Sequence, residues 1–242
     1  MKIQLKSTVD VKLIQSMGGD HMIVAAAKVS TNGLAALEFA EEGKAEDNAG
    51  LIRYLIKHRH GTPFEHSALT FFVHAPIFVW REWHRHRVGF SYNEESGRYK
   101  QLEPIFYVPD RERPMMKVDG WKPGRPKFTR CEETGVYNEL VTNLQISYEL
   151  AYEMYERNLE LGIDPGLARV CLPVGIYSGC WVTCNPRSLM HFLSLRVHDP
   201  EAKFVSYSLW EIDLAARTCE DFLKKGWPIT HEAFINNGRV AP

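Results

Sequence analysis

RHRVGFSYNEESGRY, from Arg85 to Tyr99, is the stretch from which the fold and chemistry of this chain can be predicted. With the histidine before it, this stretch carries five side chains that are, or can become, cationic: His84, Arg85, His86, Arg87 and Arg98. An arginine fork matches two phosphate oxygens at once, and serine hydroxyls and loop N–H groups complete such a shell. The pattern therefore indicates an anion site, although charged residues in a row are also typical of a solvated face.

The surroundings of the triplet favour the anion site. An aromatic strand, Ser67–Ala75, leads through Pro76 at the first helical position into a helix from Ile77 to about His86. The loop that follows contains Gly89, Asn93 and Gly97, which tolerate the tight backbone of a ligand cradle. Charges at this junction of a buried helix and a loop are expected to point inward.

Hydrophobic periodicity predicts the other elements. We expect a strand at 2–6, helices at 21–30, 48–58 and 140–159, further helices beginning at Pro165 and Pro186, and a last helix at 200–225. Residues 109–130, rich in Pro, Gly, Lys and Arg, are expected to form an exposed, mobile insertion. Strands followed mostly by helices predict an α+β fold, a single domain over residues 1–242 with a central antiparallel or mixed sheet and several long helices.

Bulk composition excludes several classes of protein. The 242 residues carry a net charge of −1, without the basic excess of a dedicated nucleic-acid binder. No apolar run is long enough for a membrane span, and no signal peptide is recognisable. The five cysteines form no CxxC pair and are expected to be free, buried or partly buried thiols. These features predict a cytoplasmic protein with neither membrane nor nucleic acid as partner.

The chain resembles the flavin-dependent thymidylate synthases. That family carries RHR followed by serine and arginine, matched here by Arg85–Arg87 and, eight residues on, Ser96-Gly97-Arg98. HRHGTPFEH at 58–66, ARVCLP at 168–173 and NPRSLMHFLSLR at 185–196 resemble three further blocks of the family. The four blocks occur in the family's order and cover roughly residues 20–215.

The resemblance implies an activity. Enzymes of this family are methyltransferases that methylate dUMP to dTMP, with methylenetetrahydrofolate as one-carbon donor and reduced FAD as hydride donor. The resemblance further implies NADPH as the reductant of the flavin, and a homotetramer with active sites shared between subunits. The chain has no GxGxxG run, so neither FAD nor NADPH is expected in a Rossmann fold.

Carried over by position, the resemblance also implies a set of site residues. The residues implied for FAD are His60, Thr62, Glu65, Arg85, His86, Arg87, Glu94, Asn185, Arg187 and His191. Those implied for dUMP are Glu82, Trp83, His84, Arg85, Glu94, Glu95, Ser96, Gly97, Arg98, Arg169 and Arg196. Arg196 would be catalytic, because a fixed cation beside uracil favours loss of the N3 proton. Ser96 has no clearly placed base and is expected to bind phosphate.

Helix geometry adds a constraint on this site. Arg187 and His191 are four residues apart and share one helix face, whereas Arg196 lies about 180° around at ~100° per residue. A single site that contacts both faces needs either a helix that ends near Arg196 or a second copy of the chain.

Two other functions compete with this interpretation. A nucleic-acid-binding module could use the RHR triplet and nearby aromatic residues. A metal-dependent hydrolase could use His58, His60 and His66, although their spacing fits no strong zinc signature, and no metal site is predicted. The group of Phe71, Phe72, Phe78, Trp80 and Trp83 is expected to be core.

Overall fold

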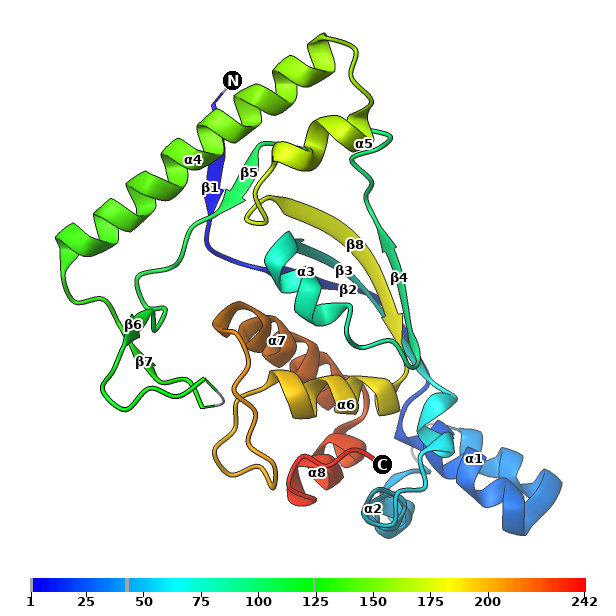
Figure 1. The fold of residues 1–242 in the computed structure, drawn as a ribbon. Coiled ribbons are helices and arrows are strands. Elements are labelled where there is room, and N and C mark those ends of the chain that lie inside the picture. Colours follow the sequence, from blue (N-terminus) through cyan, green and yellow to red (C-terminus); the bar gives the residue numbers. More distant parts are fainter. Residues whose placement is uncertain (1, 42–43, 124) are drawn as a thin grey trace. The chain divides into compact units, whose positions relative to one another are not determined.

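The computed structural model describes residues 2–41, 44–123 and 125–242 (Figure 1). Contacts within the chain divide it into two compact units. Unit 1 consists of the residues up to Asp10, His74–His84 and Asn93–Cys180, and unit 2 of Val11–Val73, Arg85–Tyr92 and Trp181–Pro242. Each unit is thus built from three separate stretches of chain. The single domain expected over residues 1–242 stays a prediction.

The largest sheet has four strands in the order β2-β3-β8-β4. Their bounds are β2 Asp10–Met17, β3 Ala68–Pro76, β8 Tyr177–Cys184 and β4 Phe90–Glu94. β1 (Gln4–Lys6) pairs in parallel with β5 (Ile105–Tyr107), and β6 (Met116–Lys117) pairs antiparallel with β7 (Phe128–Thr129). The chain is an α+β protein with parallel and antiparallel strand pairs, which confirms the predicted fold class. Because β8 lies between helices, the expected order of strands first and helices afterwards is only partly right.

The core of unit 1 forms where the long helix α4 (Thr134–Glu160) packs on the β1–β5 pair. Tyr148, Tyr152 and Tyr155 project from one face of α4 and are at most 5% exposed. Tyr152 donates a hydrogen bond from its hydroxyl to the Leu102 carbonyl (2.7 Å), and the Tyr155 hydroxyl accepts one from the Leu102 amide (3.1 Å). These three tyrosines mark the inward face of α4, and hydrogen bonds satisfy the hydroxyl groups of Tyr152 and Tyr155 inside the core.

Unit 2 gathers most of the remaining helices. They are α1 (Asp20–Asn32), η1 (Gly33–Ala40), η2 (Glu46–Asn48), α2 (Ala49–Lys57), η3 (Thr62–Glu65), α6 (Pro186–Arg196), α7 (Trp210–Gly226) and α8 (Pro228–Asn236). Within this unit α7 contacts both α6 and α8, and α2 contacts α8. The expected helices at 21–30 and 48–58 are confirmed as α1 and α2. Phe192, Ile212 and Phe234 are fully buried, so α6, α7 and α8 each contribute to the core of unit 2.

Two predicted helix boundaries were wrong. α3 spans Ile77–Trp83, with Pro76 before its first residue in an extended conformation, so this proline is not at the first helical position and the helix does not reach His86. The last long helix begins at Trp210, because Asp199–Leu209 form turns and extended backbone. Apolar residues at 205 and 209 mimic helical spacing in a segment that tertiary contacts hold non-helical.

One helix was missed, and the predicted helix start at Pro165 is confirmed. α8 begins at Pro228, which was interpreted only as the end of the preceding helix. α5 (Pro165–Ala168) and the 3₁₀ turn η4 (Arg169–Cys171) follow the Asp164 cap, where the carboxylate accepts a hydrogen bond from the Leu167 amide (3.0 Å). Proline at the first helical position fits both cases, because its missing N–H is not needed there.

The remaining expectations about the chain are met in part. Residues 109–130, of which residue 124 lies outside the described residues, hold the β6–β7 pair and are mostly exposed. None of the helices in the described part of the chain has the length and apolar composition to span a bilayer. All five cysteines are free as predicted; Cys171 is exposed and the other four are buried.

Candidate functional site

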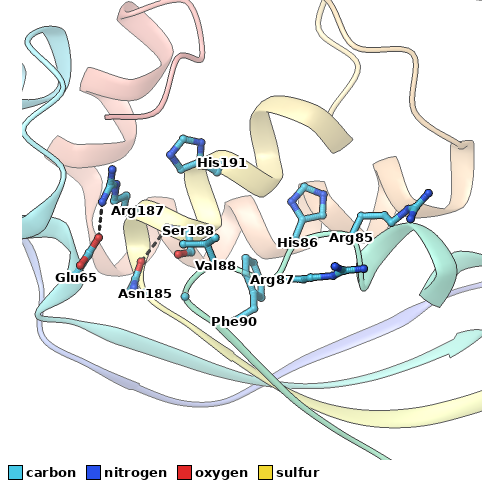
Figure 2. A pocket seen from close by; sticks show the side chains of 11 residues that line it. Glu65, Arg85, His86, Arg87, Val88, Phe90, Asn185, Arg187, Ser188 and His191 are labelled. Carbon is cyan, nitrogen blue, oxygen red and sulfur yellow. Dashed lines mark hydrogen bonds and ion pairs between the residues drawn. The ribbon is translucent and has the colours of Figure 1, made fainter.

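A cavity of about 420 Å³ in unit 2 contains the RHR triplet (Figure 2). Its walls come from three segments: the loop between α3 and β4, the first turns of α6, and the end of η3. The lining residues are Glu65, Arg85, His86, Arg87, Val88, Gly89, Phe90, Asn185, Arg187, Ser188 and His191. The triplet and the later NPRSLMH block, about a hundred residues apart in sequence, therefore meet at one site, as the sequence predicted.

Gly89 allows the loop to approach α6. Its φ is +67°, a left-handed conformation that suits glycine, and a Cβ there would collide with Ser188 Oγ and meet Asn185 Nδ2 at 3.0 Å. The other end of the loop is held by Tyr92, whose hydroxyl donates a hydrogen bond to the His86 carbonyl (2.6 Å). Backbone conformation and a side-chain contact thus fix the segment that carries the triplet.

The start of α6 aims two basic side chains at the cavity. Asn185 caps the helix by accepting a hydrogen bond from the Ser188 amide (2.8 Å), and Pro186 occupies the first helical position. Arg187 and His191, one turn apart, then lie on the same face (Figure 2). The predicted helix start and the shared face are both confirmed.

Arg187 is held by several neighbours. Its Nη1 donates to Glu65 Oε1 (2.5 Å), and its Nε donates to the Pro242 carbonyl (3.0 Å). The side chain also lies directly on the backbone of Gly61, where a Cβ would overlap the guanidinium. A guanidinium has five N–H donors, so those not used here remain for a ligand.

Arg196 reaches the same loop from the last turn of α6. Its Nε donates to His86 Nε2 (3.0 Å), although it points from the opposite side of the helix to Arg187. The helix ends at Arg196, and the Arg85–Phe90 loop runs beside it. The end of the helix at Arg196 agrees with the first of the two options raised by the helix geometry, and a single site that contacts both faces stays a prediction.

His86 is a neutral acceptor in this arrangement. Burial, together with the charges of Arg196 and His191, lowers its pKa from the ordinary 6.5 to about 4. The ring packs edge-on against Phe192, with centroids 4.9 Å apart. The expectation that His86 can become cationic is corrected for neutral solution, where the imidazole accepts the hydrogen bond from Arg196.

Positive charge dominates the lining of the cavity. The side chains of Arg85 and Arg87 have neither a hydrogen bond nor an ion pair with any described residue. Glu65 is the one acidic residue among those lining the cavity, and it is already paired with Arg187. Burial lowers the pKa of His191, the charges of Arg187 and Arg59 lower it too, and a hydrogen bond to the Pro242 backbone partly opposes them. The cavity is therefore suited to an anion.

His60 and Thr62 do not line this cavity. Both are exposed in the turn that leads into η3, and the His60 ring stacks on Tyr54 with centroids 5.8 Å apart. His58 lies against the other side of the same turn, 4.3 Å from the Tyr54 ring centroid. Within residues 2–41, 44–123 and 125–242, no three or more His, Cys, Asp or Glu side chains are grouped to hold a metal ion.

The second half of the motif lies in unit 1. Glu94 Oε1 accepts a hydrogen bond from Ser178 Oγ (2.7 Å), and Glu95 Oε1 accepts one from the Gly179 amide (2.9 Å). Glu95 also pairs with Lys100 at 3.0 Å, and this pairing raises the pKa of the lysine. Both acids are thus engaged with other residues of unit 1.

Ser96, Gly97 and Arg98 form a turn beside a second arginine. The Arg98 amide donates to Ser96 Oγ (3.3 Å), and a Cβ at Gly97 would be 3.1 Å from Arg169 Cδ. Arg98 lies over the Tyr99 ring and close to Gly166. The structure thus brings together the predicted substrate residues of the motif with Arg169 inside unit 1.

The end of α3 supplies the other predicted substrate residues. Trp83 is 1% exposed and packs on Trp80, with centroids 5.5 Å apart, so its indole belongs to the core of unit 1. His84 stacks on Trp80 from the next turn (5.2 Å), and Glu82 is half-buried. Phe71, Trp80 and Trp83 are core as expected, whereas Phe78 is half-buried and Phe72 is 37% exposed.

Sequence reasoning missed three residues that line the cavity. Val88, Phe90 and Ser188 carry no charge and stood inside matched blocks without a role. Gly89 was recognised for its backbone, but its contact with Ser188 is a tertiary one that no sequence pattern marked. Cys180 is no candidate nucleophile, because burial raises its pKa to about 12 and keeps the thiol protonated.

Comparison with known proteins agrees with this geometry. Residues 12–229 match the model of the family described as thymidylate synthase complementing protein. A flavin-dependent thymidylate synthase of Streptomyces coelicolor is 47% identical over all of this chain and 96% of its own length, and one of Tropheryma whipplei is 43% identical over 98% and 96%. The crystal structure of the UMP/dUMP methylase PolB from Streptomyces cacaoi bound with 5-Br UMP has a TM-score of 0.88 and 43% identity, over 99% of this chain and 99% of its own. The structure of PolB bound with 5-Br dUMP has a TM-score of 0.90 and 44% identity, over 99% of this chain and 100% of its own. The chain therefore belongs to the flavin-dependent thymidylate synthase family, and it is an enzyme.

Proposed function

We propose that this enzyme methylates dUMP to dTMP, using methylenetetrahydrofolate as one-carbon donor and FAD reduced by NADPH as hydride donor. The observation that carries the proposal is the cationic cavity in which the RHR loop meets α6. Its arginines and its neutral histidines match a ligand with phosphate groups and a polar ring. The names of the similar proteins, flavin-dependent thymidylate synthase and UMP/dUMP methylase, support the same reaction.

The lining of the cavity fits a flavin nucleotide. Arg85 and Arg87 offer guanidinium groups without a partner among the described residues, and Gly89 lets the loop that carries them pack closely on α6. A volume of about 420 Å³ is within the size range of small-molecule sites. We assign FAD binding to Glu65, Arg85, His86, Arg87, Asn185, Arg187 and His191, with His60, Thr62 and Glu94 as further contacts. When bound and reduced, the flavin supplies a hydride.

We assign the dUMP phosphate to the turn formed by residues 96–98 together with Arg169. Arg98 and Arg169 provide charge, and Ser96 provides a hydroxyl and loop amides. Glu95 and the Glu82–Arg85 segment complete the proposed set of contacts. Because Glu95 is paired with Lys100 and bonded to the Gly179 amide, its negative charge is partly compensated near the phosphate.

Arg196 is proposed to activate the uracil ring. A guanidinium beside the base favours the form that has lost the N3 proton, which makes the ring more nucleophilic. The neutral His86 ring accepts a hydrogen bond from Arg196 Nε and thereby holds the guanidinium in one orientation. The terminal NH₂ groups of Arg196 are then directed by this contact, and no cysteine thiolate is needed.

The assembly and setting of the enzyme are also proposals. We expect a homotetramer with shared active sites, and a cytoplasmic location where thiols stay reduced. Ile146 and Leu150 on α4 are 59% and 58% exposed, which favours burial in an assembly. A molar mass of four chains by light scattering would support the tetramer, and a stable monomer would contradict it.

An absorbance spectrum of the purified protein tests the proposed function. We expect flavin bands that bleach when NADPH is added without oxygen, and that bleach faster when dUMP is present. Methylenetetrahydrofolate should then yield dTMP. A colourless protein that takes up no added FAD would contradict the proposal.

UMP is a second candidate substrate. The two crystal structures are of a protein described as a UMP/dUMP methylase, and their identity to this chain is close to that of the named thymidylate synthases. Competition between equal concentrations of UMP and dUMP in one assay separates the two substrates. Formation of dTMP alone would support the first proposal, and comparable methylation of UMP would favour the second.

A further inference from the structure

The segment after α8, Asn237–Pro242, reaches Arg187 in the lining of the cationic cavity. The carbonyl of Pro242 accepts the hydrogen bond from Arg187 Nε at 3.0 Å, and it also interacts with His191. Pro242 and Ala241 are both buried. A backbone acceptor from this segment is therefore part of the surroundings of two lining residues, although none of residues 237–242 was predicted to belong to a site.

Arg239 fixes the course of this segment. Its side chain is 7% exposed, and its Nη2 donates to Glu220 Oε2 on α7 (2.8 Å). The second carboxylate oxygen of Glu220 lies 3.0 Å from His231 Nε2 on α8, and Asp199 lies 3.6 Å from Arg239 Nη1. Burial raises the pKa of Glu220, but the hydrogen bonds from His231 and Arg239 outweigh it and lower the pKa below the ordinary value. Glu220 is thus paired on both carboxylate oxygens inside unit 2, whereas the buried Arg239 Nε has no hydrogen-bond partner among the described residues.

The backbone at Arg239 is strained for a residue with a side chain. Its φ is +60°, and its amide closes the end of α8 by donating to the Phe234 carbonyl (3.0 Å). Such a conformation costs an L-residue other than glycine on the order of 1 kcal/mol. The contact with Glu220 therefore helps to hold Arg239 in this left-handed conformation. The next three residues, 240–242, lead from Arg239 to the contact with Arg187.

We propose that Arg239 is a positioning residue for the cofactor site, because it anchors the segment whose Pro242 carbonyl orients Arg187. Arg187 then has two acceptors, Glu65 at Nη1 and Pro242 at Nε, and its remaining N–H groups are left for a ligand. The inference rests on the proposed function, in which Arg187 contacts FAD. An arginine held before binding loses less side-chain freedom when it binds, which raises affinity.

A double-mutant cycle on the holoenzyme tests the proposal. The deletion of residues 240–242 removes the Pro242 carbonyl and leaves Arg239 with Glu220. The FAD dissociation constant, measured by flavin fluorescence on dilution, should rise about tenfold, the order expected for one hydrogen bond to a charged group. In an Arg187→Ala background the same deletion should change it less than about twofold, because the group that the carbonyl orients is gone.

Two variants control this cycle. Pro242→Ala keeps the carbonyl and should bind FAD as the unchanged protein does. Arg239→Lys keeps a positive charge for Glu220 but lacks the planar guanidinium with its several N–H donors. Its FAD affinity should therefore fall between those of the unchanged protein and Arg239→Ala. Because Arg239→Ala leaves the buried Glu220 with His231 as its only remaining partner among the described residues and can unfold, the deletion is the decisive variant.

The outcomes separate the positioning role from the proposed function. An equal loss of affinity on deletion in both backgrounds, or no loss in either, would overturn the role of the segment while FAD binding itself stands. Failure of the unchanged protein to bind FAD would instead overturn the proposed function. The deletion should also lower the His191 pKa in an NMR titration, since the Pro242 backbone raises it; an unchanged His191 pKa would contradict the contact.

Discussion

The two halves of the motif from Arg85 to Tyr99 lie in different compact units and are held differently. In the first half, Arg85 and Arg87 have side chains without a hydrogen bond or ion pair to a described residue, and the loop is fixed by its backbone. In the second half, Glu94 and Glu95 are bonded to residues of β8 in unit 1. In the proposed function the first half keeps its charges for a ligand, whereas the acids of the second half anchor the turn that carries Ser96–Arg98.

Replacement of Arg196 is expected to have the largest effect. Arg196→Ala should lower kcat by roughly 100- to 1,000-fold, because a preorganised cation at a developing charge is worth that order. FAD should stay bound, since Arg187 and the RHR arginines remain. The rate of dTMP formation and the flavin absorbance of the purified variant measure the two properties. A colourless variant would show that Arg196 is needed for FAD binding, as proposed for Arg187 and the RHR arginines.

Acidification is expected to lower the stability of the folded protein through protonation of His86, in the first half of the motif. Because its pKa is about 4 in the folded protein and 6.5 ordinarily, the unfolded chain binds more protons between these values. The free energy of unfolding should therefore fall as pH drops from 6.5 to 4, by roughly 2 kcal/mol from this residue after screening by solvent.

Urea unfolding at pH 7 and pH 5 measures this dependence. His86→Gln does not titrate and should show a smaller difference between the two pH values than the unchanged protein. If both proteins lose the same stability, the acid sensitivity comes from other groups, among them His74 and His191, whose pKa values are also lowered.

Single arginine replacements should separate the two halves by ligand. Arg87→Ala should raise the dissociation constant of FAD about tenfold and leave that of dUMP within about twofold, because one charge-assisted contact is lost. Arg98→Ala should do the reverse. Flavin fluorescence and dUMP titration monitored by flavin absorbance give both constants. If each variant weakened the binding of FAD and of dUMP equally, the two halves of the motif would not bind different ligands.

The Ser96→Ala variant is expected to have the smallest effect. The Ser96 hydroxyl accepts a hydrogen bond from the Arg98 amide, so its loss should cost only a few-fold in kcat/KM for dUMP. Substantial turnover in this variant would support a phosphate-binding role. Complete loss of turnover with dUMP affinity intact would make Ser96 a nucleophile and contradict the assignment.

Much of the site could be predicted because its chemistry is local in sequence. Asn185-Pro186 encodes its own helix start, and four-residue spacing places Arg187 beside His191. Gly89 and the triplet marked a loop that turns sharply. Helix ends were predicted less well: Pro76 and residues 200–209 fit two conformations equally, and packing chose between them.

The sequence by itself determined the family, the α+β class and the cationic character of the site, because these depend on residue types and short spacings. Only the tertiary structure decided which charges are paired, since pairing joins residues far apart in the chain. The neutral state of His86 depends on burial and on Arg196, 110 residues later. The orientation of Arg187 depends on Glu65 and on Pro242, which no local pattern connects. Burial and long-range contacts set proton affinities and side-chain directions, and neither is written in a local stretch of sequence.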